Sequence, residues 1–426
     1  MNKMKDSGIE WIGDIPVKWN LIKAKRFFIN TKRIVGTDAD KYDRLALTLN
    51  GVIKRSKDDS EGLQPEKFEG YQILHKNELV FKLIDLENVK TSRVGLSPYT
   101  GIVSPAYIVL SNNFDDNRFF YYWFMFMYYN EVFNHLGGEG VRSALNAKDV
   151  LSLPVPDINS DEQHCIADYL DRKCSQIDAI IAKQQEVIEK LKEYKMSVIT
   201  EAVTKGLNPD VPMKDSRVEW IGKIPEKWIK VKLKNVCQFI NGDRSSNYPS
   251  PNEYVDKGIP FLGADSLCER YVDITQSKKI TEEKYRSMSG AKIKKGDILY
   301  TLRGSTIGKN ALATFDEGTV ASSLMVIRPI ALIPEFLLYW LNSEEEFQQR
   351  QSYINGSTAP NLSAENVGSF TMFLPPVVEQ KKIADYIDEK CGEIESTILK
   401  KQRLIEQLDN YKKSLIYEVV TGKKEV

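Results

Sequence analysis

A stretch with the pattern of a long α-helix occurs twice in the chain, at residues 163–204 and 380–421. The run of four residues that begins at Ile166 (IADY) returns 217 positions later. No glycine or proline interrupts residues 174–205, and the second copy contains only Gly392, near its start. A helix of about 40 residues spans roughly 60 Å at about 1.5 Å per residue. The sequence therefore predicts two long helices that are copies of each other.

Each stretch has apolar residues spaced alternately by three and four positions, the heptad pattern of a helix that buries one stripe against another helix. This stripe is termed the seam. Polar Gln184 and Lys195 interrupt it in the first copy, and Lys401 and Lys412 interrupt it in the second. Polar seam residues cost stability but restrict register and partner choice. The apolar seam residues are Ile177, Ile181, Ile188, Leu191, Val198, Ile394, Ile398, Ile405, Leu408 and Leu415. We expect the seams to pair; packing of each helix on its own domain is the alternative.

The opening of the chain is repeated as well. Residues 4–19 and 213–228 share twelve of sixteen amino acids at an offset of 209. Trp11, Pro16 and Trp19 keep their places in the second copy, and we interpret the tryptophans as packing anchors. A repeat of about 210 residues is far longer than the roughly 20–50 residues of a solenoid unit. It therefore predicts a duplicated domain that is followed each time by a long helix.

Short strand signals and a helix signal lie between the opening and the long helix of each copy. Residues 78–81 match residues 297–300 as short apolar strands. Strands and helices that mix without regular βαβ alternation predict an α+β fold. In contrast, residues 31–72 show little resemblance to residues 242–286. Two domains with the same framework and different loops suggest the same task on different targets.

The composition restricts the class of protein. Lys and Arg together number 59, as do Asp and Glu, so a nucleic-acid partner would require positive charge that is concentrated locally. The five cysteines form no CxxC pair and are odd in number, which argues against a disulfide framework and a structural zinc site. The chain begins with polar residues, and the aromatic run at 119–129 is shorter than the roughly 20 residues of a membrane span. We expect a cytoplasmic protein without a membrane segment or a metal site.

We find no catalytic constellation in the sequence. Residues 304–310 resemble a phosphate-binding loop, but they have one residue too few between the glycines and Asn310 where Ser or Thr is needed. His164 and Cys165 are adjacent, but no residue that would orient the histidine is recognisable, and two lysines replace them in the second copy. We therefore expect a non-catalytic chain. A nuclease or transferase activity in a divergent domain is the enzymatic alternative.

Basic and polar residues gather in the divergent loops. Arg can bond bidentately to guanine and Asn to adenine, whereas Ser and Lys side chains contact phosphates. The candidate DNA-binding residues are Lys54, Arg55, Lys90, Arg93, Arg142 and Ser143 in the first copy, and Arg244, Ser245, Asn247, Arg303, Ser305, Lys309, Thr358 and Asn361 in the second. For each residue taken singly, a solvated surface position is the alternative.

Taken together, these features resemble the specificity subunit of a type I restriction-modification system. The residues that carry the resemblance are 7–16 with Trp19, their echo 216–225 with Trp228, the series Asn361-Leu362, Leu374-Pro375-Pro376, Glu379-Gln380 and Ile383-Ala384, and Gly296-Asp297-Ile298-Leu299 followed by Ile307-Gly308-Lys309. They cover essentially the whole chain, in the order of the family. One departure is Asn77-Glu78 in the first copy, where the second has Gly296-Asp297, so which loops read bases there stays open.

The resemblance implies that residues 1–155 and 213–375 are target recognition domains, each reading one half of a bipartite, asymmetric DNA site. It implies that residues 156–212, a spacer helix with a linker, and residues 376–426, the second spacer helix, form an antiparallel coiled coil that sets the spacer. Such subunits carry two methyltransferase subunits and are joined by motor-nuclease subunits. S-adenosylmethionine, ATP and Mg would then bind to those partners, and this chain would hold no cofactor. A coiled-coil adaptor between two protein-binding domains is the structural alternative.

Overall fold

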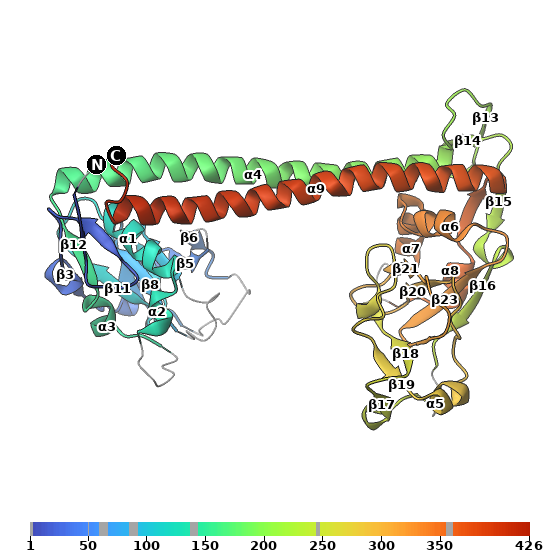
Figure 1. Ribbon diagram of the computed structural model, residues 1–426, viewed down its shortest axis with the longest axis horizontal. Helices are drawn as coiled ribbons and strands as arrows, with labels where there is room; N and C mark the ends of the chain where they lie inside the picture. Colours follow the sequence, from blue (N-terminus) through green and yellow to red (C-terminus); the bar gives the residue numbers. More distant parts are fainter. Residues whose placement is uncertain are drawn as a thin grey trace. The chain divides into compact units, whose positions relative to one another are not determined.

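The computed structural model describes residues 3–49, 51–58, 67–84, 93–136, 144–243, 248–354 and 361–426. The chain divides into two compact units (Figure 1). The first unit consists of Met1–Gln184 and Gln402–Val426, and the second unit is Gln185–Lys401. Each unit holds one globular domain and a part of each long helix, α4 (Ser160–Lys205) and α9 (Val377–Val420). The domain bounds implied by the family resemblance stay a prediction.

The first unit contains two four-stranded sheets and two short strand pairs. The pairs are β1 (Met4–Asp6) with β2 (Asp14–Pro16) and β3 (Asn20–Lys23) with β12 (Pro154–Asp157). One sheet has the order β4 (Ile29–Asn30), β11 (Ile108–Ser111), β8 (Leu79–Lys82), β9 (Arg93–Leu96), and the other β6 (Gly51–Arg55), β5 (Arg44–Thr48), β10 (Gly101–Val103), β7 (Gln72–Leu74). The helices beside α4 and α9 are α1 (Arg118–Tyr129), α2 (Val132–His135) and α3 (Ala147–Leu151), with 3-10 turns at Ala24–Arg26 and Gly36–Lys41. Between the described strands of these two sheets, the pairings are antiparallel except that of β5 with β10.

The second unit repeats this plan. Its strand pairs are β13 (Met213–Asp215) with β14 (Lys223–Pro225) and β15 (Ile229–Lys232) with β24 (Thr371–Leu374). One sheet has the order β16 (Cys237–Asn241), β23 (Leu324–Pro329), β20 (Ile298–Thr301), β21 (Asn310–Leu312), and the other β17 (Tyr254–Val255), β19 (Lys278–Ile280), β18 (Ile259–Leu262), β22 (Thr319–Val320). The helices are α5 (Glu282–Ser287), α6 (Pro334–Leu341), α7 (Glu344–Ile354) and α8 (Ala364–Gly368), with 3-10 turns at Leu233–Asn235, Pro251–Glu253 and Ala264–Ser266. The predicted duplicated α+β fold is confirmed.

The core of the first unit forms around α1, whose sequence RFFYYWFMFMYY is mostly aromatic. Phe81 of β8 packs edge-on against Phe124 with ring centroids 5.1 Å apart. Trp123 is fully buried, and its Nε1 donates a hydrogen bond of 2.9 Å to the carbonyl of Pro154. In the second unit α6 takes the same place between α9 and the β16-β23-β20-β21 sheet (Figure 1). The aromatic run therefore forms a helix of the core of the first unit.

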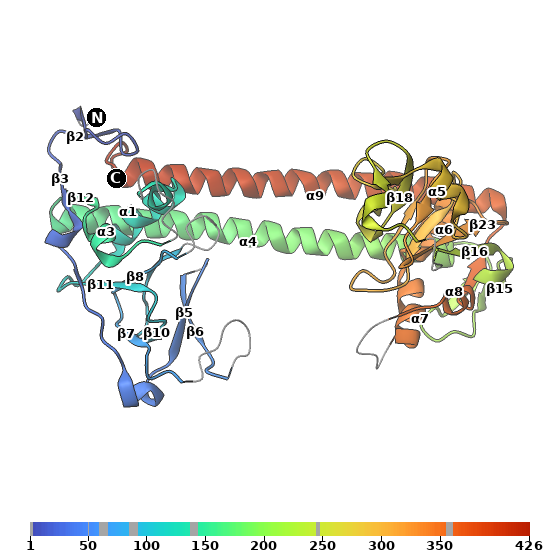
Figure 2. The same ribbon diagram turned by 90° about the horizontal axis from the view of Figure 1, so that it is seen from below.

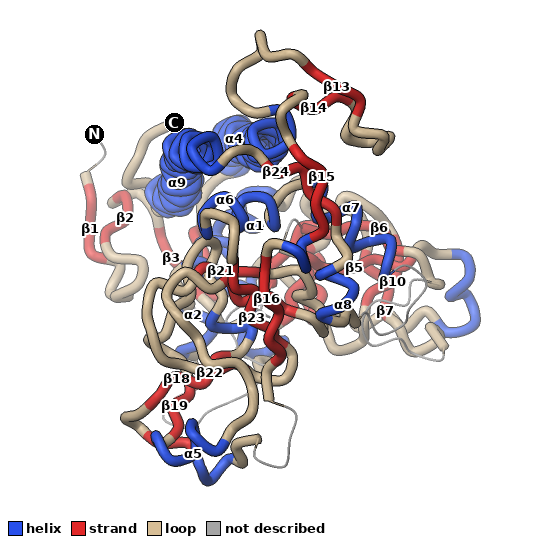
Figure 3. Tube along the Cα trace, turned by 90° about the vertical axis from the view of Figure 1, so that its right-hand side faces the viewer, coloured by secondary structure: helices blue, strands red, loops and turns tan. Residues whose placement is uncertain are grey.

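Within each unit, α4 and α9 run side by side in opposite directions (Figures 2 and 3). In the first unit Lys412 Nζ lies 2.6 Å from Asp178 Oδ1, and in the second unit Lys195 Nζ lies 2.6 Å from Glu395 Oε1. The two pairs occupy equivalent positions of the repeat, and through them two of the polar seam residues, Lys195 and Lys412, form ion pairs with the opposite helix. Each of the ten apolar seam residues is buried or half-buried. The predicted antiparallel coiled coil is confirmed in both units.

The departure from the family pattern at Asn77-Glu78 has a physical explanation. Asn77 has a φ of 69° and Gly296 a φ of 90°, and Asn is one of the few residues besides glycine that adopt this left-handed conformation. Glu78 Oε1 lies 2.7 Å from Arg33 Nη1, as Asp297 Oδ2 lies 2.7 Å from Arg328 Nη2. The two turns are therefore built alike despite their different sequences.

The second unit contains a buried carboxyl, that of Glu345 on α7. The side chain is 3% exposed, and its Oε1 has no hydrogen-bond partner. Burial raises the pKa of this carboxyl to about 7. Because the folded-state pKa lies above the ordinary 4.5, the contribution to stability is complete below about pH 4.5 and is lost as the pH rises to about 7.

We expect Glu345→Gln to stabilise the second unit by roughly 3 kcal/mol at pH 8, because an uncharged amide avoids the cost of burying a carboxylate. Urea unfolding monitored in the second unit should give equal stability for the variant and the wild type near pH 4.5 and a difference that grows up to about pH 7. The control is Glu344→Gln, because Glu344 is exposed. A variant that is less stable than the wild type at pH 8 would contradict this account.

In the described ranges, none of the helices combines the length and the apolar character that crossing a membrane requires.

Candidate nucleic-acid interface

A tryptophan fixes the opening segment of each domain to the long helices. Trp19 is 2% exposed, and its Nε1 donates a hydrogen bond of 3.0 Å to Glu162 Oε1 at the start of α4. Trp228 is fully buried and donates a hydrogen bond of 3.2 Å to Glu379 Oε2 at the start of α9. The residue after the end of the opposite helix also contacts the ring in the first unit. Gly422, which follows α9, packs on Trp19. A Cβ at Gly422, whose φ is +70°, would lie 2.4 Å from Pro16 Cγ, so this junction requires glycine.

A tyrosine and an arginine attach each domain to the body of a long helix. In the first unit Tyr122 donates a hydrogen bond of 2.6 Å to Asp171 on α4, and Arg118 Nη1 lies 2.6 Å from the same carboxylate. In the second unit Tyr339 donates to Asp388 on α9, and Arg270 Nη2 lies 2.5 Å from it. The tyrosines and aspartates are repeat-equivalent, whereas the arginines come from unrelated positions. The domains are thus held on the helices at two places each.

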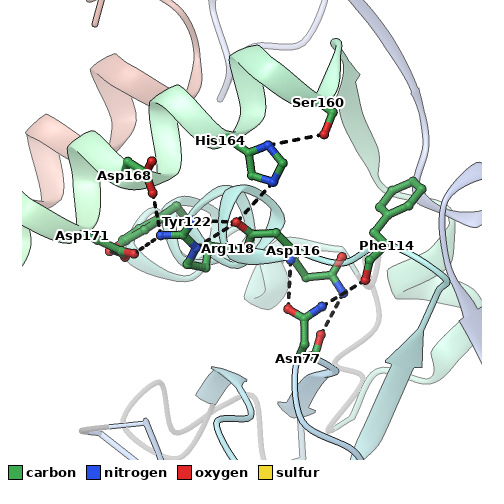
Figure 4. Close-up of polar contacts among 10 residues, drawn as sticks. Asn77, Phe114, Asp116, Arg118, Tyr122, Ser160, His164, Asp168 and Asp171 are labelled. Carbon is green, nitrogen blue, oxygen red and sulfur yellow. Dashed lines mark hydrogen bonds and ion pairs between the residues drawn. The ribbon is translucent and has the colours of Figure 1, made fainter.

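Figure 4 shows the polar cluster around Arg118 in the first unit. Arg118 also bonds Asp116, and although burial alone would raise the pKa of the Asp116 carboxyl, the hydrogen bonds from Arg118 lower it. His164 Nε2 lies 3.5 Å from Asp116 Oδ2, and Ser160 Oγ lies 3.4 Å from His164 Nδ1. An acidic neighbour of His164 therefore exists that sequence analysis did not find. These contacts exceed the roughly 2.6–3.2 Å of a nucleophile–base pair, and Asp116 is already paired with Arg118. The cluster ties α4 to α1.

Four of the predicted DNA-binding residues lie together in the second unit. Arg303, Ser305 and Lys309 lie in the loop that connects β20 to β21, and Arg303 forms a β-bridge with Asn361. Arg303 Nε donates a hydrogen bond of 3.0 Å to Asn361 Oδ1, and all four side chains are exposed. Gly308, with a φ of +89°, ends the loop where a Cβ would lie 2.4 Å from Arg350 Nε. A rigid turn thus presents guanidinium, hydroxyl, ammonium and amide groups to solvent.

The first unit has the same framework at the equivalent place. Ile84 forms a β-bridge with Ala144, and Leu145 N bonds the carbonyl of Leu83 at 3.0 Å, as Leu362 N bonds that of Leu302 at 2.9 Å. Arg93 begins β9, on the strand that leaves this loop. Two further candidates, Lys54 and Arg55, lie on β6 of the other sheet. Lys54 Nζ is 2.7 Å from Asp43 Oδ2, so this ammonium is already ion-paired.

The remaining candidates, Lys90, Arg142, Ser143, Arg244, Ser245, Asn247 and Thr358, lie outside the described residues. The assignment of each of the fourteen candidates as a DNA contact stays a prediction.

A second basic and aromatic cluster in the second unit was missed by sequence analysis. Lys278 Nζ lies 4.6 Å from the ring centroid of Tyr254 on the neighbouring strand β17. Tyr248, which follows the candidate loop at residues 244–247, packs edge-on against Phe261 with centroids 5.4 Å apart. Aromatic faces beside ammonium groups suit stacking on bases and contacts to phosphates. The adjacent lysines at residues 278–279 were the available signal.

Comparisons with known proteins agree with this framework. Residues 225–407 match the model of the type I restriction modification DNA specificity domain. The type I restriction enzyme EcoBI specificity subunit of Escherichia coli is 24% identical over 318 residues, which cover 69% of this chain and 66% of that protein. The MjaVIII specificity subunit of Methanocaldococcus jannaschii is 26% identical over 280 residues, which cover 64% of this chain and 62% of that protein. The second half of the chain thus matches the DNA specificity domain of type I restriction modification, and the chain is similar to type I specificity subunits.

The matches span just under two thirds of the length of these two specificity subunits. A structural match extends over nearly the whole chain. A chain from a solved structure that describes complex assembly and conformational transition of the type I R-M system superimposes with a TM-score of 0.70, covering 95% of this chain and 98% of that one at 16% identity. This match shows that the two chains share a fold.

Proposed function

We propose that each globular domain of this chain reads one half of a bipartite, asymmetric DNA site. The observation that supports this most strongly is the repeated loop framework. The bridges Ile84–Ala144 and Arg303–Asn361 lie at the same place on two copies of one fold, and the sequences that follow Ile84 and Arg303 are unrelated. Base contacts specify a DNA sequence, whereas the framework only positions the side chains that make them. Different loops on equal frameworks would give two different half-sites.

The long helices would set the distance between those half-sites. A helix of 46 residues such as α4 is about 69 Å long. Half-sites on one face of DNA recur about every 34–36 Å, so a rod of this length suits half-sites one or more helical turns apart. The ion pairs at Lys195 and Lys412 support this role, because cross-helix charge pairs restrict the register of the two helices.

We further propose that the chain itself makes and breaks no bonds and that two methyltransferase subunits dock on the helices. Motor-nuclease subunits would join them. Repeat-equivalent exposed tyrosines, Tyr194 at 57% and Tyr411 at 53%, offer two equal surfaces on α4 and α9, as two copies of one partner would need. S-adenosylmethionine, ATP and Mg would belong to those partners.

Arg303→Ala tests the base-reading loop. We expect the complex of this chain with its methyltransferase subunits to bind its specific DNA about 5- to 150-fold more weakly, because a bidentate contact to a guanine contributes about 1–3 kcal/mol. Competition binding against DNA altered in one half-site should show relaxed discrimination in one half only. The control is Arg286→Ala, because Arg286 is an exposed arginine of the same unit that pairs with Glu282. Unchanged discrimination in Arg303→Ala with unchanged affinity would exclude Arg303 as a contact.

A further inference from the structure

The second unit contains a cavity of about 330 Å³ between α4, α6 and α9. Its apolar wall includes Met196, Ile199 and Leu338, and its polar wall includes Asn342 and Arg270. Small-molecule sites commonly have a volume of this order. Charged side chains also line this cavity, among them Lys195, Asp388 and Glu395. The Nε of Arg270 is buried and has no hydrogen-bond partner. Arg270 lines the cavity, and its Nη2 lies 2.5 Å from Asp388 Oδ1.

The cavity exists because the second domain has less side-chain volume at this place than the first. Leu338 stands at the position of Tyr121 in the repeat, and Gly392 at that of Ser175. The covering helix is also shorter, since α6 ends at Leu341 whereas α1 continues to Tyr129, five residues beyond the equivalent position. After α6 the chain continues as α7. Glu346 of α7 forms hydrogen bonds with Tyr300 and Arg350, so this helix contacts the domain and does not cover α9 as the end of α1 covers α4.

The first unit fills the equivalent space with two tyrosine rings. Tyr121 and Tyr129 both pack against the core of the first unit. Burial raises the pKa of the Tyr121 phenol to about 12, with smaller contributions from Cys174 and Asp178. Burial likewise raises the pKa of Tyr129, and Cys174 and Asp178 again contribute. These two neighbours are the repeat equivalents of Cys391 and Glu395, which line the cavity in the second unit.

We propose that the cavity of the second unit is a binding site for a phenol ring. The apolar wall takes the ring where the first domain has its own tyrosines, and the guanidinium of Arg270 offers N–H donors to the phenolic oxygen. The ring comes either from a free phenolic molecule or from a tyrosine residue of a protein bound to the helices. The proposal needs neither DNA nor a methyltransferase, so it stands apart from the function proposed above.

The test measures binding of p-cresol, the side-chain analogue of tyrosine, to the full chain by ligand-observed NMR and isothermal titration. We expect one equivalent with a Kd of roughly 0.1–1 mM, as suits a ligand of so few atoms. Leu338→Tyr, which supplies the ring from the chain, should reduce binding at least tenfold. Its control is Leu399→Tyr at an exposed position of α9 in the same unit, which should leave binding unchanged. Wild-type binding by Leu338→Tyr, or none by the natural chain, would overturn the proposal.

A reciprocal variant protects the test against misfolding of Leu338→Tyr. The double variant Tyr121→Leu/Tyr129→Ala opens the equivalent space in the first unit, so p-cresol binding should rise from one equivalent to two. A count that stays at one would count against the proposal. N-acetyltyrosinamide separates the sources of the ring. Binding of both probes assigns the site to a tyrosine residue, and binding of p-cresol alone assigns it to a free phenol. Binding of neither rejects the site, whatever the DNA experiments show.

Discussion

Trp228→Ala is expected to destabilise the second unit by about 3–5 kcal/mol. Trp228 is fully buried, and its ring lies where the start of α9 meets the end of α4. Removing the ring leaves a cavity and also leaves Glu379 without its hydrogen-bond donor. Hydrogen exchange of backbone amides, followed by mass spectrometry, should show faster exchange throughout β15, β24 and the adjoining helix segments.

Two comparisons make this result specific. Trp220→Ala removes the other tryptophan of the same opening segment, which is 61% exposed, and should cost less than about 1 kcal/mol. Trp19→Ala removes the equivalent buried ring and should speed exchange in the first unit instead. If the backbone amides of the second unit exchanged at equal rates in Trp228→Ala and Trp220→Ala, the buried Trp228 ring would not be the attachment point of the domain.

Leu415→Asp is expected to cost at least about 3 kcal/mol, because Leu415 is 1% exposed on the seam of α9 and a carboxylate there loses its hydration without gaining a partner. The helix signal in circular dichroism should melt at a lower temperature, and exchange should rise in the first unit. The matched control is Tyr411→Asp, four residues earlier on the same helix and 53% exposed. Equal melting of the two variants would show that the seam does not stabilise the helix pair.

Much of the fold could be predicted because the chain contains two copies of one sequence pattern, which can be compared with each other. The repeat at an offset of 217 placed Lys195 and Lys412 at equivalent seam positions, and both form cross-helix ion pairs. The heptad spacing predicted helices at residues 163–204 and 380–421, within a few residues of their observed ends. Strands predicted at 78–81 and 297–300 occur one residue later, because strand ends depend on pairing partners far away in sequence.

The candidate site was less predictable because its contacts are not local. Arg303 meets Asn361 across 58 positions, which neither spacing nor composition indicates. Arg270 and Arg118 reach equivalent aspartates from positions that do not correspond in the repeat, so comparing the copies could not reveal the shared role. The cavity beside Leu338 depends on where α6 ends, and the run of Glu344, Glu345 and Glu346 gave no sign that two of these side chains would be buried.

The central claim is that the two domains recognise DNA independently of each other. Its most direct test is a domain exchange. Residues 20–150 are replaced by those of a relative that recognises a different DNA sequence, and the methylation pattern of the assembled complex is then read by sequencing. The account predicts that one half-site changes to that of the relative, while the other half-site and the spacer stay as they were. A change in both half-sites, or in neither, would contradict it.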